Sequence, residues 1–274
     1  MKVFDFNRSD NPYELDRFSY DKSIVALTRK NSAFIEAVVA LDSNYSRETQ
    51  IVAPSHGYDP ELHYSNADGK YCGSSMYWFA QMQLAVSEKD FRRSVLGAVI
   101  AVDTTNSTHL SAAEDGRKQM RDIICDACKS VEELIAKLNV DYTPVDEKHL
   151  INLMNVPLKA AGREGVRFNI SFASKFCSYA SKFYKCNIEY PKYDKVVARN
   201  LPLYIEAYLG EHVKKLCFLM PDNNTDVERK KSQESLIYRS YWDYIERIIA
   251  TLPQEDVVTK EQFDHIVWYT KKGK

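Results

Sequence analysis

The sequence has no long apolar run, whereas a membrane-spanning helix needs about 20 consecutive apolar residues. We therefore expect no transmembrane helix and no membrane partner. The first residues, MKVFDFNRSDNPYEL, also lack the apolar stretch of a secretory signal peptide. Both absences lead us to expect an intracellular, cytoplasmic protein.

Glycine and proline are scarce, with 9 residues each among 274, which argues against a fibrous or disordered chain. Metal-ligand patterns are also missing. The six histidines are scattered, and Cys125 and Cys128 form a lone C-x-x-C pair in a helix-like stretch. Without a second pair nearby, metal or redox chemistry at these cysteines is only a minor alternative. We expect no cofactor and no metal site.

Charge is unevenly distributed along the chain. The whole sequence has a net charge of −1, but residues 151–200 contain nine basic and three acidic side chains, a net charge of +6. A cationic segment in an otherwise acidic protein suits contact with an anionic partner such as nucleic acid. A solvated helix surface would give the same composition, so charge alone does not decide between the two.

The spacing of apolar residues predicts a mostly α-helical protein. One helix is expected over 33–41, with Asn31 or Ser32 as its cap and Phe34, Ala37, Val38 and Leu41 on one face. Further helices are expected over 111–138, 146–160, 171–184, from just after Pro191 to 208, 234–251 and 261–269. Loops are expected over 44–73, where a short hairpin has room, and over 221–233. We divide the chain into a lead-in (1–25), a helical subdomain (26–143) and a second subdomain (144–274).

The stretch from Arg167 to Asn200 combines three features that carry chemistry. A helix–turn–helix unit leads to a second helix, which Asn169 or Ser171 caps and whose first amides, around Ser171–Ser174, are suited to bind a phosphate. Lys175 follows among apolar residues, where loss of hydration frees its amine to attack carbon. Asp194 comes just after Pro191 at the start of the next helix, so that its carboxylate is expected to face the same cleft.

This stretch resembles the helix-hairpin-helix DNA glycosylase superfamily, nearest to its 8-oxoguanine branch. Members carry a hairpin, a lysine in the second helix and, after a proline, an aspartate at the interval found between Lys175 and Asp194. Arg199 matches a frequent arginine, and the closing segment FDHIVWYTKKGK is similar to the final helix of bacterial relatives. The sequence departs from the pattern where Ser171 and Ala173 replace the hairpin glycines. It also departs at Val196, which replaces a common histidine.

The resemblance implies a fold of two helical subdomains with the active-site cleft between them. It also implies a monomeric enzyme that binds double-stranded DNA, extrudes one nucleotide and excises its base, with or without lyase activity. The implied catalytic residues are Asp194 and Lys175. The implied DNA-binding residues are Asn169, Ser171, Ala173, Ser174, Arg167, Lys192, Lys195 and Arg199. The excised base is an oxidised purine or a modified phage base such as glucosylated hydroxymethylcytosine, and the role is DNA repair or antiviral defence.

Two other readings remain open. A non-catalytic helix-hairpin-helix protein would bind DNA without releasing any base. A small helical interaction protein would use the basic segment to contact an acidic partner and would show no salt-dependent binding of DNA.

Overall fold

The computed structural model describes residues 2–6, 23–55, 57–63, 72–106, 108–110, 115–159, 166–219 and 227–271. These residues form twelve α-helices and two ladders of two short strands each, so the expectation of a mostly helical protein is confirmed. The chain divides into two compact units that are interleaved in sequence. Unit 1 contains Met1–Asp42, Pro191–Asp222 and Leu236–Lys274, and unit 2 contains Ser43–Tyr190 and Asn223–Ser235. Residues 25 and 143, the expected boundaries, lie within unit 1 and unit 2 respectively.

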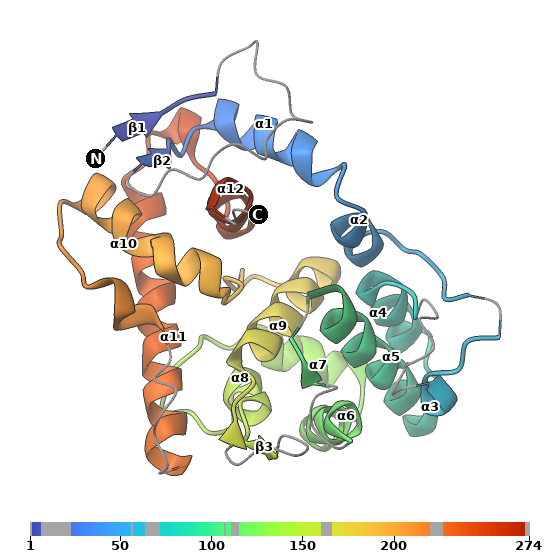
Figure 1. Ribbon diagram of the computed structural model, residues 1–274. Coiled ribbons are helices and arrows are strands. Elements are labelled where there is room, and N and C mark those ends of the chain that lie inside the picture. Colours follow the sequence, from blue (N-terminus) through green and yellow to red (C-terminus); the bar gives the residue numbers. More distant parts are fainter. Residues whose placement is uncertain are drawn as a thin grey trace. The chain divides into compact units, whose positions relative to one another are not determined.

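Unit 1 combines a parallel strand pair with helices from both ends of the chain. Its elements are β1 (Lys2–Phe4), β2 (Ser23–Val25), α1 (Arg29–Val39), α10 (Lys195–Leu209), η3 (Lys215–Phe218), the part of α11 (Val227–Ala250) from Leu236 onward, η4 (Gln254–Asp256) and α12 (Lys260–Lys271). Helix α12 packs against both α1 and α10 (Figure 1). At the α10 contact, the rings of Tyr204 and Phe263 meet edge to face, with their centroids 5.4 Å apart.

Helix α1 starts at Arg29, earlier than expected, because Thr28 caps it. The Thr28 hydroxyl oxygen accepts a hydrogen bond of 3.2 Å from the Asn31 amide. The Asn31 side chain is buried instead, and it donates at 2.8 and 2.9 Å to oxygens of the residues that follow β1 and β2. The apolar face of Phe34, Ala37, Val38 and Leu41 is therefore not the face that α1 buries. The residues that α1 buries are Asn31, Ser32, Ile35 and Val39.

Unit 2 is organised around the long helix α5. Its elements are α2 (Ser43–Thr49), α3 (Pro60–His63), α4 (Ser75–Gln83), α5 (Glu88–Asn106), α6 (Gly116–Ala127), α7 (Val131–Leu138), α8 (Leu150–Met154), β3 (Leu158–Lys159), β4 (Val166–Arg167), α9 (Ile170–Tyr184) and the part of α11 up to Ser235. Helix α5 packs against α4, α6 and α9 and buries nearly all of its residues from Phe91 to Asp103. The described residues of 44–73 hold α2 and α3 and no strand, although a short hairpin had been considered there.

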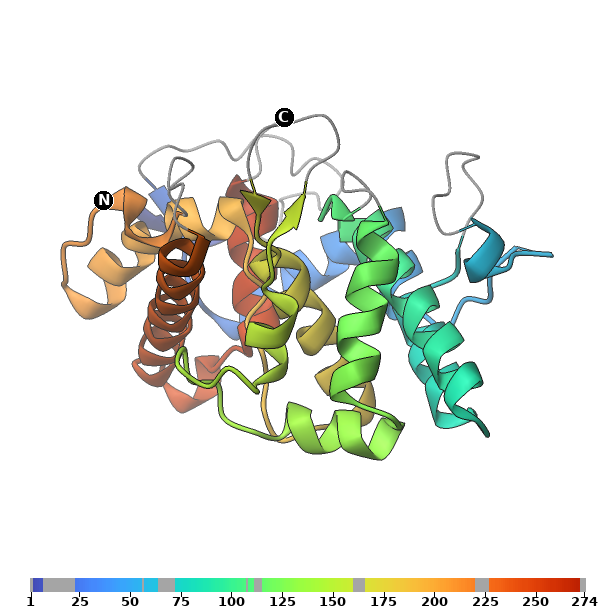
Figure 2. The same ribbon diagram turned by 90° about the horizontal axis from the view of Figure 1, so that it is seen from below.

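The single helix expected over 111–138 is two helices. Helix α6 ends at Ala127, where Cys128 takes an extended conformation (φ −141°, ψ 124°). Helix α7 then begins at Val131, and the side chain of Ser130 caps it by accepting a hydrogen bond of 3.4 Å from the Glu133 amide. Figure 2 shows that the two helices run in different directions. Residues 111–114, where the long helix was expected to start, lie outside the described residues.

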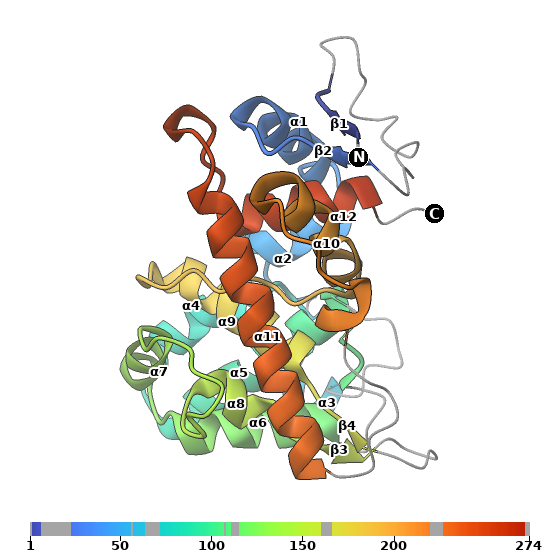
Figure 3. The same cartoon turned by 90° about the vertical axis from the view of Figure 1, so that its left-hand side faces the viewer.

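The connection between α8 and α9 holds more than the turn that was predicted between the two helices. The helix expected over 146–160 spans only Leu150–Met154. The ring of His149 caps its start by accepting a hydrogen bond of 3.2 Å from the Ile151 amide. Strand β3 then pairs antiparallel with β4, with Leu158 opposite Arg167 (Figure 3). A short antiparallel pair of strands therefore lies between α8 and α9. Residues 160–165 lie outside the described residues.

The remaining helices lie closer to the bounds predicted from the sequence. Helices α9, α10 and α12 match the helices expected over 171–184, from after Pro191 to 208, and over 261–269. Helix α11 begins at Val227, so the helix expected over 234–251 starts earlier and replaces part of the loop predicted over 221–233. Residues 221–226 of that loop lie outside the described residues.

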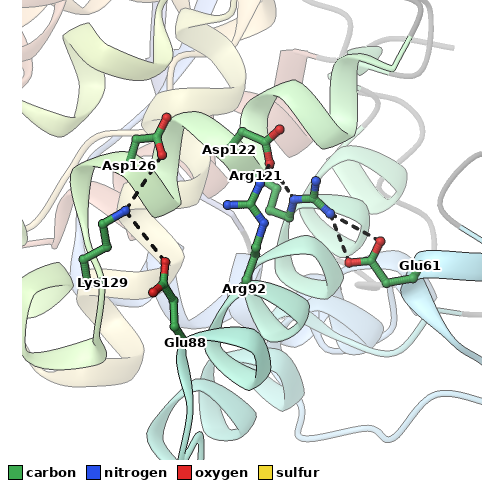
Figure 4. Close-up of polar contacts among 7 residues, drawn as sticks. All are labelled: Glu61, Glu88, Arg92, Arg121, Asp122, Asp126 and Lys129. Atoms are coloured by element: carbon green, nitrogen blue, oxygen red, sulfur yellow. Dashed lines mark hydrogen bonds and ion pairs between the residues drawn. The ribbon is translucent and has the colours of Figure 1, made fainter.

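Ion pairs connect α3, α5 and α6 at the surface of unit 2 (Figure 4). Arg121 of α6 contacts Glu61 of α3 at 3.0 Å and its neighbour Asp122 at 2.7 Å. Arg92 of α5 contacts the same Asp122 carboxylate. Because Arg121 is nearly buried and shares its partners, the cluster stabilises the unit more than isolated surface pairs would. Lys129 makes longer contacts with two acidic residues, one of α5 and one of α6.

Candidate active site

Asp194 occupies the N-cap position of α10. Its backbone is extended (φ −126°, ψ 139°), and its Oδ1 accepts a hydrogen bond of 2.7 Å from the Val196 amide. The side chain remains half-exposed. The helix dipole and the free amides of the first turn stabilise a carboxylate at this position. The expectation that Asp194 would stand at the start of the helix after Pro191 is confirmed.

Two of the residues predicted to contact DNA lie on the first turns of α10, shortly after Asp194. Lys195 and Arg199 are both exposed, and residues four apart on a helix share one face. Their positive charges therefore lie close to the helix start that presents Asp194. An anionic backbone approaching this helix start would meet both side chains.

Lys192, also predicted to contact DNA, is placed differently. Its side chain is only 5% exposed, and its ammonium nitrogen lies 3.3 Å from a carboxylate oxygen of Glu261 in α12. The lysine is thus directed into the interior of unit 1. This arrangement disfavours a direct contact between Lys192 and a phosphate.

Lys175 lies in the first half of α9 in unit 2. Its side chain is only 7% exposed. Phe172, one turn before it, and Tyr179, one turn after it, are buried as well. Lys175 is therefore flanked along α9 by buried aromatic residues.

The polar groups of Asn169, at the start of α9, form other hydrogen bonds than the capping bond that was expected. Asn169 stands at the N-cap position, but its side chain makes no capping hydrogen bond. The side-chain amide donates to the Val156 carbonyl at 2.8 Å, and the backbone amide donates to the side-chain oxygen of Asn155 at 3.1 Å. Asn169 therefore ties α9 to the residues that follow α8, and the expectation that it caps the helix was wrong.

The amides predicted to bind a phosphate are only partly available. The Ala173 amide donates a hydrogen bond of 2.8 Å to the Asn169 carbonyl. Ala173 and Ser174 are both fully buried. Ser171 is half-exposed and lies in the first turn, whose amides have no partner within a helix. The amides that remain candidates for binding a phosphate are those of Ser171 and its neighbours in that turn. Arg167 lies in β4.

The two predicted catalytic residues belong to different units, Lys175 to unit 2 and Asp194 to unit 1. The joint action of the two groups on one nucleotide stays a prediction.

A titratable residue that the sequence did not suggest is Glu234 of α11, in unit 2. Its side chain is buried, and its Oε2 atom accepts no hydrogen bond from the described residues. Burial raises the pKa of this carboxyl to about 7, and the charge of Lys230 and the amide of Asn155 offset only part of that effect. A carboxyl of this kind exchanges its proton near neutral pH. No sequence pattern marks it, because Glu234 follows a run of charged residues typical of a solvated helix.

The C-x-x-C pair has the properties of buried structural thiols. Cys125 and Cys128 are both buried, and burial raises their pKa values to about 12 and about 11. Thiols of this kind are poor nucleophiles and poor metal ligands at neutral pH. Among the described residues, no three histidine, cysteine, aspartate or glutamate side chains are grouped so that they could hold a metal ion.

The chain matches no protein-family model, no curated protein and no solved structure. Within the described residues, no helix has both the length and the apolar character needed to span a membrane.

Proposed function

We propose that the protein is a helix-hairpin-helix type DNA glycosylase that extrudes a damaged or modified base and excises it. The observation that carries the proposal is the Asp194 carboxylate at the N-cap of α10, followed by exposed Lys195 and Arg199. A buried lysine in α9 and the mostly helical architecture add support. The β-ladder between α8 and α9 and the buried Ala173 and Ser174 depart from the family pattern.

In this mechanism Asp194 stabilises the positive charge that develops on the sugar as the glycosidic bond breaks. The amine of Lys175 attacks C1′ of the sugar, and the base leaves with the bonding electrons and takes up a proton. Opening of the sugar ring gives a Schiff base, which either hydrolyses or eliminates the 3′ phosphate. The proposal requires both groups to reach the same extruded nucleotide. If water replaces Lys175 as nucleophile, the enzyme excises bases without lyase activity.

The proposed substrate is double-stranded DNA with an oxidised purine or a bulky modified base such as glucosylated hydroxymethylcytosine. Extrusion of a nucleotide costs a few kcal/mol of stacking and pairing energy, and damaged bases cost the least. The decisive experiment incubates the protein with duplexes and phage genomes that carry different modified bases, and identifies released bases by mass spectrometry. Release of one modified base and not of normal bases is the expected result.

The role of Asp194 is tested with Asp194→Asn. Asparagine is as good an N-cap residue as aspartate, so the helix start is preserved while the charge is lost. We expect DNA binding to persist and base release to fall by about a hundredfold or more. Full activity of the variant would exclude the catalytic role. If the unmodified protein releases no base and Asp194→Asn binds DNA as well as it does, a non-catalytic DNA-binding protein would be favoured instead.

The role of Lys175 is tested by borohydride reduction, which traps a Schiff base between protein and DNA. We expect a covalent adduct with the unmodified protein and none with Lys175→Gln. Lys182→Gln is the matched control, because Lys182 lies on the same helix but is exposed. Adduct formation by Lys175→Gln would refute the assignment.

A further inference from the structure

The segment Pro191–Tyr193, which leads directly to Asp194, is held by side chains of α11. The Tyr238 hydroxyl donates a hydrogen bond of 2.9 Å to the Pro191 carbonyl. The Tyr241 hydroxyl donates one of 2.9 Å to the next carbonyl, that of Lys192. Both tyrosines are 0% exposed and lie three residues apart, on one face of α11. Two consecutive carbonyls are thus bound by two consecutive turns of one helix.

Further contacts hold the same segment from other elements of unit 1. The Lys192 ammonium pairs with Glu261 of α12 at 3.3 Å. The Tyr193 hydroxyl donates to the Phe218 carbonyl of η3. Each residue from 191 to 193 therefore has a tertiary hydrogen bond or ion pair. The next residue is Asp194, whose own carboxylate is bound to the Val196 amide.

The hydroxyl groups of Tyr238 and Tyr241 are needed for these hydrogen bonds and not for packing, because phenylalanine would fill the same apolar space. A buried hydroxyl destabilises the fold unless it forms a hydrogen bond, and the carbonyls of a segment outside regular structure need donors. Burial, followed by the nearby carboxylates of Asp264 and Asp194, raises the pKa of Tyr241 well above its usual value. The Tyr241 hydroxyl therefore keeps its proton and remains a donor at every pH at which the protein would work.

We propose that Tyr238 and Tyr241 are positioning residues, which fix the backbone before α10 so that the Asp194 carboxylate is held where base excision requires it. This inference rests on the proposed glycosylase function. Neither tyrosine needs to touch the DNA. Catalytic groups have to be held within a fraction of an ångström, and a displacement of about 1 Å costs up to a hundredfold in rate.

The test compares Tyr241→Phe and Tyr238→Phe with the unmodified protein in single-turnover base excision, with enzyme in excess. We expect the rate constant of excision to fall about tenfold in each variant while the affinity for DNA stays the same. Tyr142→Phe is the matched control, because Tyr142 in unit 2 is also buried and donates to a backbone carbonyl, that of Ser235, at 3.1 Å. Its excision rate should not change. An unchanged rate in both α11 variants would overturn the inference.

A double substitution separates positioning from a general loss of stability. In the Asp194→Asn background, Tyr241→Phe should reduce the excision rate no further, because the group that it positions has lost its charge. An additional tenfold loss in that background would overturn the inference. If Tyr241→Phe does not fold, Tyr238→Phe carries the same comparison.

A second readout does not depend on activity. Exchange of the Val196 amide hydrogen, measured by NMR, reports on its bond to Asp194. We expect exchange to be about tenfold faster in the two α11 variants and unchanged in Tyr142→Phe. Unchanged exchange in all three would overturn the positioning role even if the protein excises bases. Faster exchange in a protein that releases no base from any duplex would support the positioning of Asp194 and refute the proposed function.

Discussion

Gly97 of α5 lies directly against the indole ring of Trp78 of α4. A Cβ atom at position 97 would come within 2.1 Å of the ring, and the indole is itself fixed by a hydrogen bond of 2.7 Å from its nitrogen to the Cys72 carbonyl. We therefore expect Gly97→Ala to destabilise the protein by about 1–3 kcal/mol through overpacking, despite the higher helix propensity of alanine. Urea unfolding followed by circular dichroism measures the loss.

The control for this prediction removes the indole. In a Trp78→Leu background the ring no longer opposes the new methyl group, so Gly97→Ala should then cost less than it does alone. Equal costs in the two backgrounds would show that the close approach of α4 and α5 is not the cause.

Arg117 and Asp103 form an ion pair inside unit 2. Their closest atoms are 2.7 Å apart, and the two side chains are 8% and 1% exposed. The other carboxylate oxygen of Asp103 accepts hydrogen bonds from the Thr108 hydroxyl and the Leu110 amide. Arg117→Met leaves a buried carboxylate without its counter-charge and should cost about 3–5 kcal/mol of folding free energy. Thermal and urea unfolding provide the measurement.

The matched control is Arg93→Met in the same unit. Arg93 is 51% exposed and lies 3.5 Å from Asp59, so its removal should cost less than about 1 kcal/mol. A similar loss for both substitutions would contradict the view that burial of the Arg117–Asp103 pair sets its contribution.

Local signals explain which helices could be predicted from the sequence. Helix α10 follows from Pro191 and the capping aspartate, whose bond to Val196 spans two residues. The break before α7 also has a local signal, the S-x-x-E spacing of Ser130 and Glu133, which the apolar periodicity concealed. The buried face of α1 could not be predicted, because Asn31 is buried by bonds to residues up to 26 positions away.

The candidate site shows the same division between local and distant partners. The N-cap position of Asp194 could be predicted because the start of α10 is signalled by nearby residues, Pro191 and the capping aspartate itself. The burial of Lys192 could not be predicted because its partner, Glu261, is 69 residues away, and no periodicity or spacing in the sequence connects them. Glu234 could not be identified because its burial depends on the tertiary structure, and the Asn155 amide that acts on its carboxyl is also far away in sequence.

Glu234 should make stability depend on pH around neutrality. Its pKa is raised from 4.5 to about 7 in the folded protein, so the folded state binds a proton more tightly than the unfolded state does. The resulting stability is fully present below about pH 4.5 and is lost as the pH rises through about 7. We expect Glu234→Gln to remove this dependence. The stability difference between the variant and the unmodified protein should change by about 3 kcal/mol from acidic to mildly alkaline pH.

Urea unfolding of both proteins across this pH range provides the measurement. At mildly alkaline pH the glutamine variant should be the more stable of the two, because no charge is buried. Parallel pH curves for the two proteins would show that another group is responsible.

The buried thiols should be inert in the folded protein. Burial raises the pKa values of Cys125 and Cys128 to about 12 and about 11, so the thiolate fraction at neutral pH is very small. Cys217, by contrast, is exposed. Treatment of the native protein with iodoacetamide should therefore modify Cys217 first and leave Cys125 and Cys128 unmodified until the protein unfolds, as read by peptide mass spectrometry. Rapid modification of the C-x-x-C pair would contradict its structural role.

The exposed and the buried basic residues around Asp194 should differ in their effect on DNA binding. Each side chain that neutralises a phosphate adds about one unit to the slope of log affinity against log salt concentration. We expect Lys195→Gln and Arg199→Gln each to lower that slope by about one unit, because both side chains are exposed on the first turns of α10. Lys192→Gln should leave the slope unchanged and instead reduce stability, since it removes the buried ammonium that pairs with Glu261. Fluorescence anisotropy with a short duplex at about 50 to 200 mM salt distinguishes these outcomes. A loss of slope on substitution of Lys192, with none at Lys195 and Arg199, would mean that DNA approaches unit 1 by a face other than the start of α10.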